Sequence, residues 1–329
     1  MKRIILVSLF AVFLLLTGCR PETVYAPTEA EDTPSLRVVA TIFPQFDFVR
    51  QIAGDRVELH MLLSPGAESH AFEPAPRDMI TINDADLLIY TGGHGDIWVE
   101  RILGSLERDD MRIAALLDLV EPVMGELIEG MEGSHDHDHG HAHHHGHDHH
   151  GHKLHYDEHV WTCPKNAIII VKALTDILVE LDPENAELFR ENAAAYITEL
   201  EALDRAFADV VSGGARNTVI FGDRFPFRYL ADTYGLTYFA AFTGCSAETQ
   251  ASPATIAFLI QKIQNENIPV VFHIEFSNRL IANTIAEATG ARLLEMHSLH
   301  NVSHADFTAG VTYLDLMRRN VETLKEALN

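Results

Sequence analysis

The sequence predicts an α/β protein with two lobes, each a mostly parallel four-stranded sheet flanked by helices, joined by one long rigid helix. Short β-rich runs alternate with segments of helical spacing, which indicates βαβ units and parallel sheets. The same alternation occurs before and after one continuous helical pattern of about thirty residues. The 329 residues suggest about two domains of roughly 100–200 residues each. A hydrophobic fraction of 47% can supply both cores.

The N-terminus has the pattern of a secretory signal. A basic start, Met1-Lys2-Arg3, precedes the apolar run IILVSLFAVFLLLTG and then Cys19. The run is too short to predict a spanning helix, and LLTGC resembles the bacterial lipobox. We therefore expect residues 1–18 to be a lipoprotein signal peptide and Cys19 to carry the lipid. The alternative, an uncleaved anchor, also places the folded part outside the cytoplasm. The polar, acidic residues 19–35 are typical of a flexible tether.

The first lobe is expected over residues 36–181. LRVVATIF begins it as a strand, and QFDFVRQIAGD follows as a helix that stops at glycine. The further strands are VELHMLL, LLIYTG and MRIAALLD, and the further helices are PRDMITINDADLL, IWVERILGSLE and NAIIIVKALTDILVELD.

A histidine-rich segment interrupts this lobe. Between His135 and His155, twelve of 21 residues are histidine, whereas the other 308 residues contain eight. Glycines punctuate the segment and it has no apolar periodicity, so we expect residues 133–155 to be a disordered loop with an accessory metal-binding role. The histidines expected to bind metal there are His135, His137, His139, His141, His143, His144, His145, His147, His149, His150 and His152.

The linking helix is predicted over residues 182–213. Asp182 suits its N-cap, Pro183 its first position, and Gly213-Gly214 its end. An apolar stripe at helical spacing contains Leu188, Ala195, Ile197, Leu200, Leu203 and Phe207. At 1.5 Å per residue the helix would be about 45 Å long, which suits a rod between two lobes.

The second lobe is expected over residues 214–329. NTVIFGD, TYFAAF, VVFHIEF and RLLEMH are its predicted strands. FRYLADTYGL, PATIAFLIQKIQNENI and RLIANTIAEATG are predicted helices, and the chain closes on GVTYLDLMRRNVETLKEALN.

Polar residues follow several strand ends, where parallel sheets bind ligands. His70 follows VELHMLL, Asp223 ends VIFGD, Glu275 ends VVFHIE and His297 ends LLEMH, while His159 precedes a helix. Zinc takes four N, O or S ligands, and imidazole favours zinc over harder cations. Each residue alone also has an ordinary interpretation, such as an exposed histidine, a helix cap or an ion pair. Together they indicate a metal cleft.

Longer motifs resemble a known family. PGAESHAFEPAPRD, DEHVWTCPKNA after the histidine-rich segment, the long helix, and DRFPFRYLADTYGL are similar to the metal-capturing lipoproteins of zinc and manganese ABC importers. The resemblance covers nearly the whole mature chain. It implies two lobes bridged by one helix with the metal between them.

The resemblance also implies a ligand set. His70 matches the first family histidine and His159 the second. The third ligand position falls on Arg224, which cannot bind a cation, so the neighbouring Asp223 is our substitute. The fourth falls on His297, with His300 as its competitor.

Three histidines and a carboxylate favour zinc as the transported ion, with manganese as second choice. The resemblance implies an ABC permease and its cytoplasmic ATPase as partners, and a bacterial membrane reached through the N-terminal lipid. We expect a monomer. Acidic residues outnumber basic ones 48 to 24, which argues against nucleic acid.

Two other functions stay open. One is a secreted zinc hydrolase with Glu275 or Asp223 as the general base. The other is a passive zinc buffer or adhesin that works through the histidine-rich segment alone. For Cys163 and Cys245 we expect two buried thiols rather than a disulfide.

Overall fold

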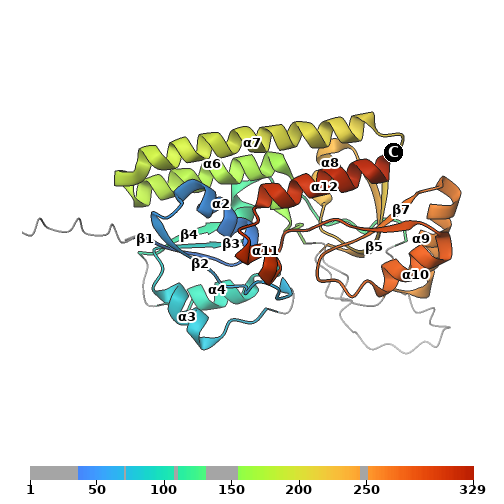
Figure 1. The fold of residues 1–329 in the computed structure, drawn as a ribbon. Helices are drawn as coiled ribbons and strands as arrows, with labels where there is room; N and C mark the ends of the chain where they lie inside the picture. Colours follow the sequence, from blue (N-terminus) through green and yellow to red (C-terminus); the bar gives the residue numbers. More distant parts are fainter. Residues whose placement is uncertain (1–35, 70–71, 107–109, 131–154, 245–250) are drawn as a thin grey trace, which may run out of the picture. The chain divides into compact units, whose positions relative to one another are not determined.

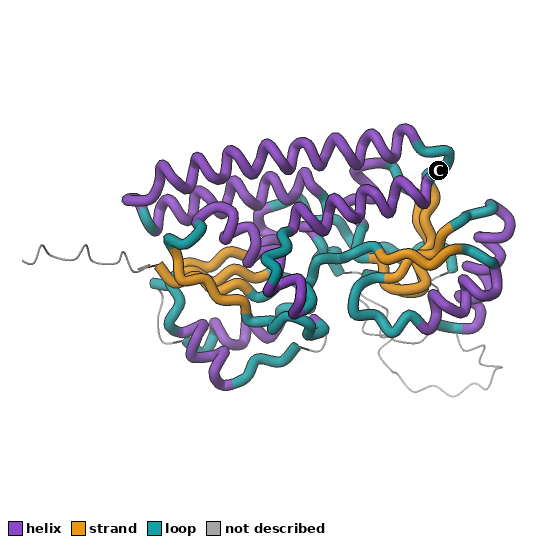
Figure 2. The backbone as a smooth tube through the Cα atoms, in the orientation of Figure 1, coloured by secondary structure: helices purple, strands orange, loops and turns teal. Residues whose placement is uncertain are grey.

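The computed structural model describes residues 36–69, 72–106, 110–130, 155–244 and 251–329. All of these described residues belong to one compact unit. The strands in this unit form two four-stranded sheets, and all of their pairings are parallel (Figures 1 and 2). This confirms the predicted fold class. The predicted signal peptide, tether and histidine-rich segment lie outside the described residues.

The first sheet has the strand order β2-β1-β3-β4. Its strand β1 is buried on both faces, with Val38 in the core shared with the helical layer and Val39 in a separate core on the other face. Burial on both faces explains the nearly continuous apolar run of this strand. The strands are β1 (Leu36–Ala40), β2 (Val57–Met61), β3 (Leu87–Tyr90) and β4 (Arg112–Ala115).

Helices cover both faces of the first sheet. In Figure 1, α3 and α4 lie on one side of it, and α2, α6 and α7 lie on the other. Proline occupies the first position of α3 and α6, where its missing N–H costs no hydrogen bond. The helical elements of this half are α2 (Phe43–Ala53), α3 (Pro76–Asn83), α4 (Ile97–Leu103), α5 (Leu116–Leu119), the 3-10 turn η2 (Val160–Thr162) and α6 (Pro164–Leu181).

The second sheet has the order β6-β5-β7-β8. The pairing of β5 with β6 shifts register between Phe221 and Arg224. Gly222 lies in this interval, and a Cβ there would come within 2.4 Å of the Cα of Ala282, so only glycine allows the close approach of β5 to α10. The elements are β5 (Thr218–Phe225), α8 (Arg228–Tyr234), β6 (Thr237–Thr243), α9 (Pro253–Glu266), β7 (Val270–His273), α10 (Leu280–Thr289), β8 (Arg292–Glu295), α11 (His304–Thr308) and α12 (Tyr313–Leu328).

The long helix α7 (Ala186–Gly213) has 28 residues and follows the 3-10 turn η3 (Pro183–Asn185). The Asp182 carboxylate accepts the Asn185 N–H, so the predicted capping residue caps the turn. The second half of the predicted stripe is confirmed by the burial of Leu200, Leu203 and Phe207. In the first half, Ile197 is partly buried against the core, but Leu188 and Ala195 are exposed and the prediction is wrong for them; the buried positions there are Phe189, Ala193 and Tyr196.

The end of the chain returns to the first sheet. Phe43 N–H donates to the carbonyl of His300 at 3.2 Å, and the rings of Phe46 and Phe307 lie 5.5 Å apart. The N–H of Tyr313 donates to the buried Asp47 carboxylate at 2.6 Å. Figure 1 shows α11 and α12 beside α2. Residues from His300 onward therefore contact the lobe that the chain left after α6.

One large core runs from the first sheet through α2, α6, α7 and α12 to the second sheet. Smaller cores fill the outer faces of the sheets, under α3 and α4 and under α9 and α10. Within the described part of the chain, no helix combines the length and apolar character needed to cross a bilayer.

Candidate metal centre

A cavity of about 300 Å³ lies beyond the carboxyl ends of β1, β2 and β3. This is where a parallel sheet is expected to bind a ligand. Its aromatic wall contains Phe72, Trp98 and Trp161. Its polar lining contains Thr41, Ser69, Thr91, His94, Asp96, Glu158 and His300.

His159 lies at the start of η2 and is buried, with 1% of its surface exposed. Its Nδ1 lies 2.8 Å from Oδ1 of Asp157, and the same oxygen accepts the His159 backbone N–H at 2.9 Å. A carboxylate that accepts the Nδ1 proton selects the tautomer with its lone pair on Nε2 and fixes the ring. This is the usual support of a metal-binding histidine.

The second lobe contacts this histidine. A Cβ at Gly244, just after β6, would lie 3.0 Å from Cε1 of His159 and 2.8 Å from the carbonyl oxygen of Phe225. Tyr229 of α8 donates its hydroxyl to the carbonyl of Asp157 at 2.7 Å. His159 therefore lies where residues of both sheets meet.

His300 is the histidine in ring contact with His159. The two ring centroids lie 4.7 Å apart at 86°, and the Trp161 ring lies 5.0 Å from that of His300. The chain reaches this position through Leu299, whose φ of 67° is in the left-handed region and bends the backbone after β8.

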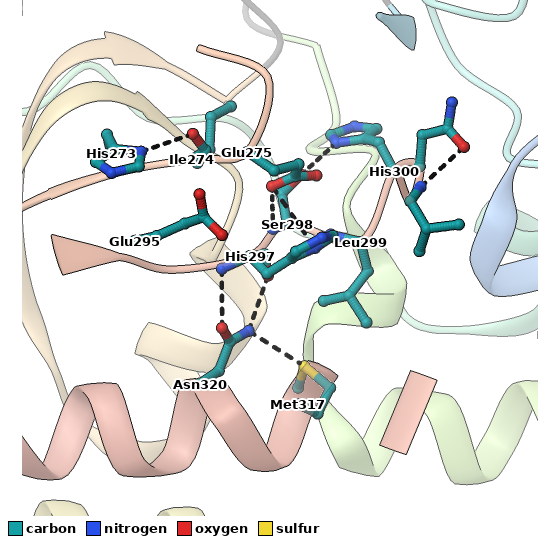
Figure 3. A network of polar contacts seen from close by, with 12 residues as sticks. His273, Ile274, Glu275, Glu295, His297, Ser298, Leu299, His300, Met317 and Asn320 are labelled. Carbon is teal, nitrogen blue, oxygen red and sulfur yellow. Dashed lines mark hydrogen bonds and ion pairs between the residues drawn. The ribbon is translucent and has the colours of Figure 1, made fainter. Parts of the chain in front are cut away.

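A buried polar chain orients His300 (Figure 3). Oε1 of Glu275 accepts the Ser298 hydroxyl at 2.5 Å, and Oε2 accepts the Ser298 N–H at 2.6 Å. Oγ of Ser298 lies 2.7 Å from Nδ1 of His300. Because the serine proton goes to the carboxylate, Nδ1 of His300 is the donor in this contact, and the lone pair lies on Nε2. Both histidines thus have the tautomer that binds metal through Nε2.

His297 is oriented differently. Its Nδ1 accepts the Leu299 N–H at 3.0 Å and lies 3.7 Å from Oε2 of Glu275. Its backbone is held by Asn320, which accepts the His297 N–H and donates to the His297 carbonyl, both at 2.8 Å. Figure 3 shows His297 and His300 as neighbours of the same carboxylate. His297 as a ligand stays a prediction.

Asp223 lies at the irregular end of β5 and is 6% exposed. Its carboxylate accepts the Arg224 N–H at 2.8 Å and the Ile274 N–H at 3.4 Å. These contacts fix the carboxylate against the backbone between β5 and β7. Asp223 as a ligand therefore also stays a prediction.

Other predicted residues lie outside the described ranges: His70, Cys19, Cys245 and the eleven accessory histidines. The described neighbours of His70 on either side, Ser69 and Phe72, both line the cavity. Cys163 is a buried free thiol whose Sγ lies 3.3 Å from Oγ1 of Thr233, and burial raises its pKa. Among the described residues, no group of three or more His, Cys, Asp or Glu side chains lies close enough together to hold a metal ion.

Asp96 closes one side of the cavity. Its carboxylate accepts the N–H groups of Thr91 and Gly92 at 2.8 and 3.1 Å. Burial, with a smaller contribution from the Glu158 charge, raises the pKa of Asp96 to about 6, although both hydrogen bonds oppose the shift.

Several supporting residues have only weak signals in the sequence. Asp157 is two residues before His159, a spacing that allows the side chain to reach its neighbour's ring. Ser298 has no such signal, since its role depends on the distant Glu275. The rings of His94 and His155 stack on each other, but no sequence feature near either residue predicts this contact.

Comparison with known proteins decides the family. The model of the zinc-uptake complex component A, periplasmic (ZnuA), matches residues 38–327. The chain belongs to the ZnuA family. It is 32% identical to the zinc-binding lipoprotein AdcA of Streptococcus pneumoniae serotype 4 in an alignment of 329 positions that covers 99% of this chain and 61% of that protein. The chain thus spans less than two thirds of that relative.

Another ZnuA-family relative has a similar length. The high-affinity zinc uptake system protein ZnuA of Bacillus subtilis is 31% identical over 321 residues, which cover 97% of this chain and 95% of that protein. The Zn(II)-bound ZnuA-like domain of Streptococcus pneumoniae AdcA has the same fold, with a TM-score of 0.70 and 27% identity. That match covers 89% of this chain and 98% of the domain.

Proposed function

We propose that this ZnuA-family protein captures Zn²⁺ between its two lobes outside the cytoplasm and delivers it to the permease of an ABC importer. The observation that carries the proposal is the contact between His159 and His300. Each ring has its Nδ1 tied to a fixed acceptor, and their centroids lie 4.7 Å apart. Two oriented imidazoles from distant parts of the chain, the buried His159 and the half-buried His300, favour zinc over manganese. The names of the relatives, zinc-binding lipoprotein and zinc uptake protein, support the same ion.

For the ligand set we propose His70, His159 and a histidine from residues 297–300. The ring contact supports His300, and the resemblance supports His297. Asp223 remains a candidate carboxylate. Glu275 is a further one, because its Oε2 lies 3.7 Å from Nδ1 of His297 and its Oε1 is joined to His300 through the Ser298 hydroxyl. Manganese is the second candidate ion, and a carboxylate-rich set would favour it.

Zinc titration by calorimetry tests this proposal. We expect His70→Ala, His159→Ala and His300→Ala each to lose tight binding of one zinc, whereas His60→Ala, on the exposed side of β2, retains it. Asp223→Ala, Arg224→Ala and His297→Ala then identify the remaining ligand. Unchanged tight binding in both His159→Ala and His300→Ala would overturn the metal centre.

Zinc-loaded protein also distinguishes transport from the two alternative functions, a zinc hydrolase and a passive zinc buffer or adhesin. A catalytic zinc keeps a position open for water, whereas a transport site is expected to be filled by protein ligands. X-ray absorption of the zinc-loaded protein counts these ligands. Deletion of residues 134–152 tests the passive buffer or adhesin: tight binding of one zinc is expected to survive. Loss of all tight binding would favour the buffer.

Delivery and anchoring are tested in membranes. We expect zinc uptake by vesicles that contain the permease and ATPase to require the added protein. Cys19 is the proposed lipid attachment site, so Cys19→Ala is expected to release the protein from cells without changing its zinc affinity.

A further inference from the structure

Trp161 lies between the two histidines of the candidate metal centre. Its ring centroid is 5.6 Å from that of His159 and 5.0 Å from that of His300, and both pairs are T-shaped. The residue is 1% exposed and lines the cavity. It comes from η2, so it belongs to the same lobe as His159. One buried aromatic side chain therefore contacts both imidazoles.

The indole N–H of Trp161 forms a hydrogen bond to the chain beyond the second sheet. Nε1 donates to the carbonyl oxygen of Ser298, 137 residues away in the sequence, at 2.9 Å. The N–H of Ser298 is bonded to Glu275, so the peptide groups on both sides of the serine Cα are held. Rotation about the Ser298 backbone bonds is thereby restricted. Its hydroxyl oxygen stays at 2.7 Å from Nδ1 of His300.

The main chain of Trp161 is fixed in turn by the first residue of α12. The Tyr313 hydroxyl donates to the Trp161 carbonyl at 2.7 Å. Tyr313 is fully buried, and its ring packs against that of Phe48 in α2, with centroids 4.9 Å apart. Both the carbonyl and the indole N–H of Trp161 are therefore held in the metal-free fold.

We propose that Trp161 is a positioning residue for zinc capture: its indole N–H fixes the Ser298 backbone, and Ser298 then holds the His300 ring opposite His159. The inference rests on the proposed function. An imidazole that is already oriented loses less conformational freedom when the metal binds, so the hydrogen bond is expected to raise zinc affinity. Phenylalanine at this position keeps a ring against both histidines and removes only the donor, which separates positioning from packing.

A double-mutant cycle with Ser298→Ala tests the role. Trp161→Phe alone is expected to weaken zinc binding by about tenfold, the lower end of the cost of losing a supporting partner of a metal ligand. In the Ser298→Ala background the hydroxyl that transmits the effect is absent, so the same substitution is expected to cost less than about twofold. Competition with a zinc chelator measures the four affinities. A tenfold loss in both backgrounds, or wild-type affinity in Trp161→Phe, would overturn the proposal.

Hydrogen exchange of the metal-free protein gives a second readout. Trp161→Phe is expected to speed exchange in the peptide that contains residues 297–301, because the Ser298 backbone loses one of its two partners. Trp98→Phe is the matched control. This tryptophan lines the same cavity but packs against Phe72, with centroids 5.4 Å apart, and its replacement is expected to leave that exchange unchanged. Unchanged exchange in Trp161→Phe would also overturn the positioning.

Tyr313→Phe gives a second route to the same test if loss of the buried indole prevents folding. It keeps Trp161 and removes the hydroxyl that holds the Trp161 carbonyl. The cycle of this variant with Ser298→Ala is again expected to be less than additive, and additive losses would contradict the proposal. Failure of the proposed function gives a different result, namely tight zinc binding that survives in both His159→Ala and His300→Ala.

Discussion

At the residue scale, the candidate centre depends on side chains that orient the histidines. Asp157 fixes His159 locally, whereas His300 is fixed by Ser298, which is itself held by Glu275 from another strand end. Such supporting hydrogen bonds raise the basicity of the imidazole. They also fix the orientation of the ring before the metal binds, so less conformational freedom is lost on binding.

Ser298→Ala is therefore expected to weaken zinc binding by about 10–100-fold, the usual cost of losing a supporting partner of a metal ligand. The variant removes the hydroxyl between Glu275 and His300 but keeps the Ser298 N–H bond to Glu275. Competition with a zinc chelator measures the change. Ser212→Ala, on the exposed end of α7, is the control and is expected to bind as the wild type does. Wild-type affinity in Ser298→Ala would mean that His300 needs no such support.

At the element scale, the loop after β6 must approach His159 closely. A side chain at Gly244 would meet a backbone carbonyl and the imidazole, neither of which can move freely. The close contact of this loop with His159 thus depends on one glycine.

Gly244→Ala is expected to destabilise the protein by about 1–3 kcal/mol, as overpacking usually does, and to weaken zinc binding by displacing the His159 ring. Gly213→Ala is the matched control, because a Cβ at the end of α7 meets nothing within 4 Å and alanine favours the helix. Urea unfolding and zinc competition measure both variants. Equal stability of the two would contradict the predicted clash.

A second element, α12, begins with a capping box. Thr312 Oγ1 accepts the Asp315 N–H, and the Asp315 carboxylate accepts the hydroxyl and N–H of Thr312. These hydrogen bonds, the hydroxyl first, lower the pKa of Asp315. A carboxyl whose pKa is lower in the folded state stabilises the fold above its unfolded pKa, and that contribution disappears as the pH falls through the folded pKa.

Thr312→Ala is expected to cost about 1 kcal/mol at pH 7, the usual value of an N-cap. The difference from wild type is expected to shrink as the pH falls below 4, because protonated Asp315 no longer favours the cap. Unfolding in urea from pH 7 to pH 3 measures it, with Thr198→Ala in the middle of α7 as control. A difference independent of pH would show that the charge of Asp315 contributes nothing.

At the scale of the whole molecule, the two sheets, the long helix and His159 were predictable from local patterns. Alternating apolar runs specify the strands, and the DEH motif places a carboxylate near its histidine. The neighbour of His159 was harder to predict. His300 reaches it because residues 299–328 turn back onto α2 and α7 through Leu299, the Asp47–Tyr313 hydrogen bond and a shared core. Such a return depends on tertiary packing, and no local spacing expresses it.

This return has a thermodynamic consequence. Because His159 precedes α6 and His300 follows β8, an ion bound by both connects segments 141 residues apart, and unfolding separates them. Zinc bound to the folded state alone is expected to add about 4 kcal/mol of stability at a free concentration 1,000-fold above its Kd. Metal requires neutral imidazoles, so this increment is expected to fall as the pH drops through about 6.5, the ordinary histidine pKa. Calorimetric melting with and without zinc at pH 7.5 and 5.5 measures it. The double variant His159→Ala/His300→Ala is expected to lack the increment at both pH values, and an equal zinc increment in that variant would place the stabilising ion elsewhere.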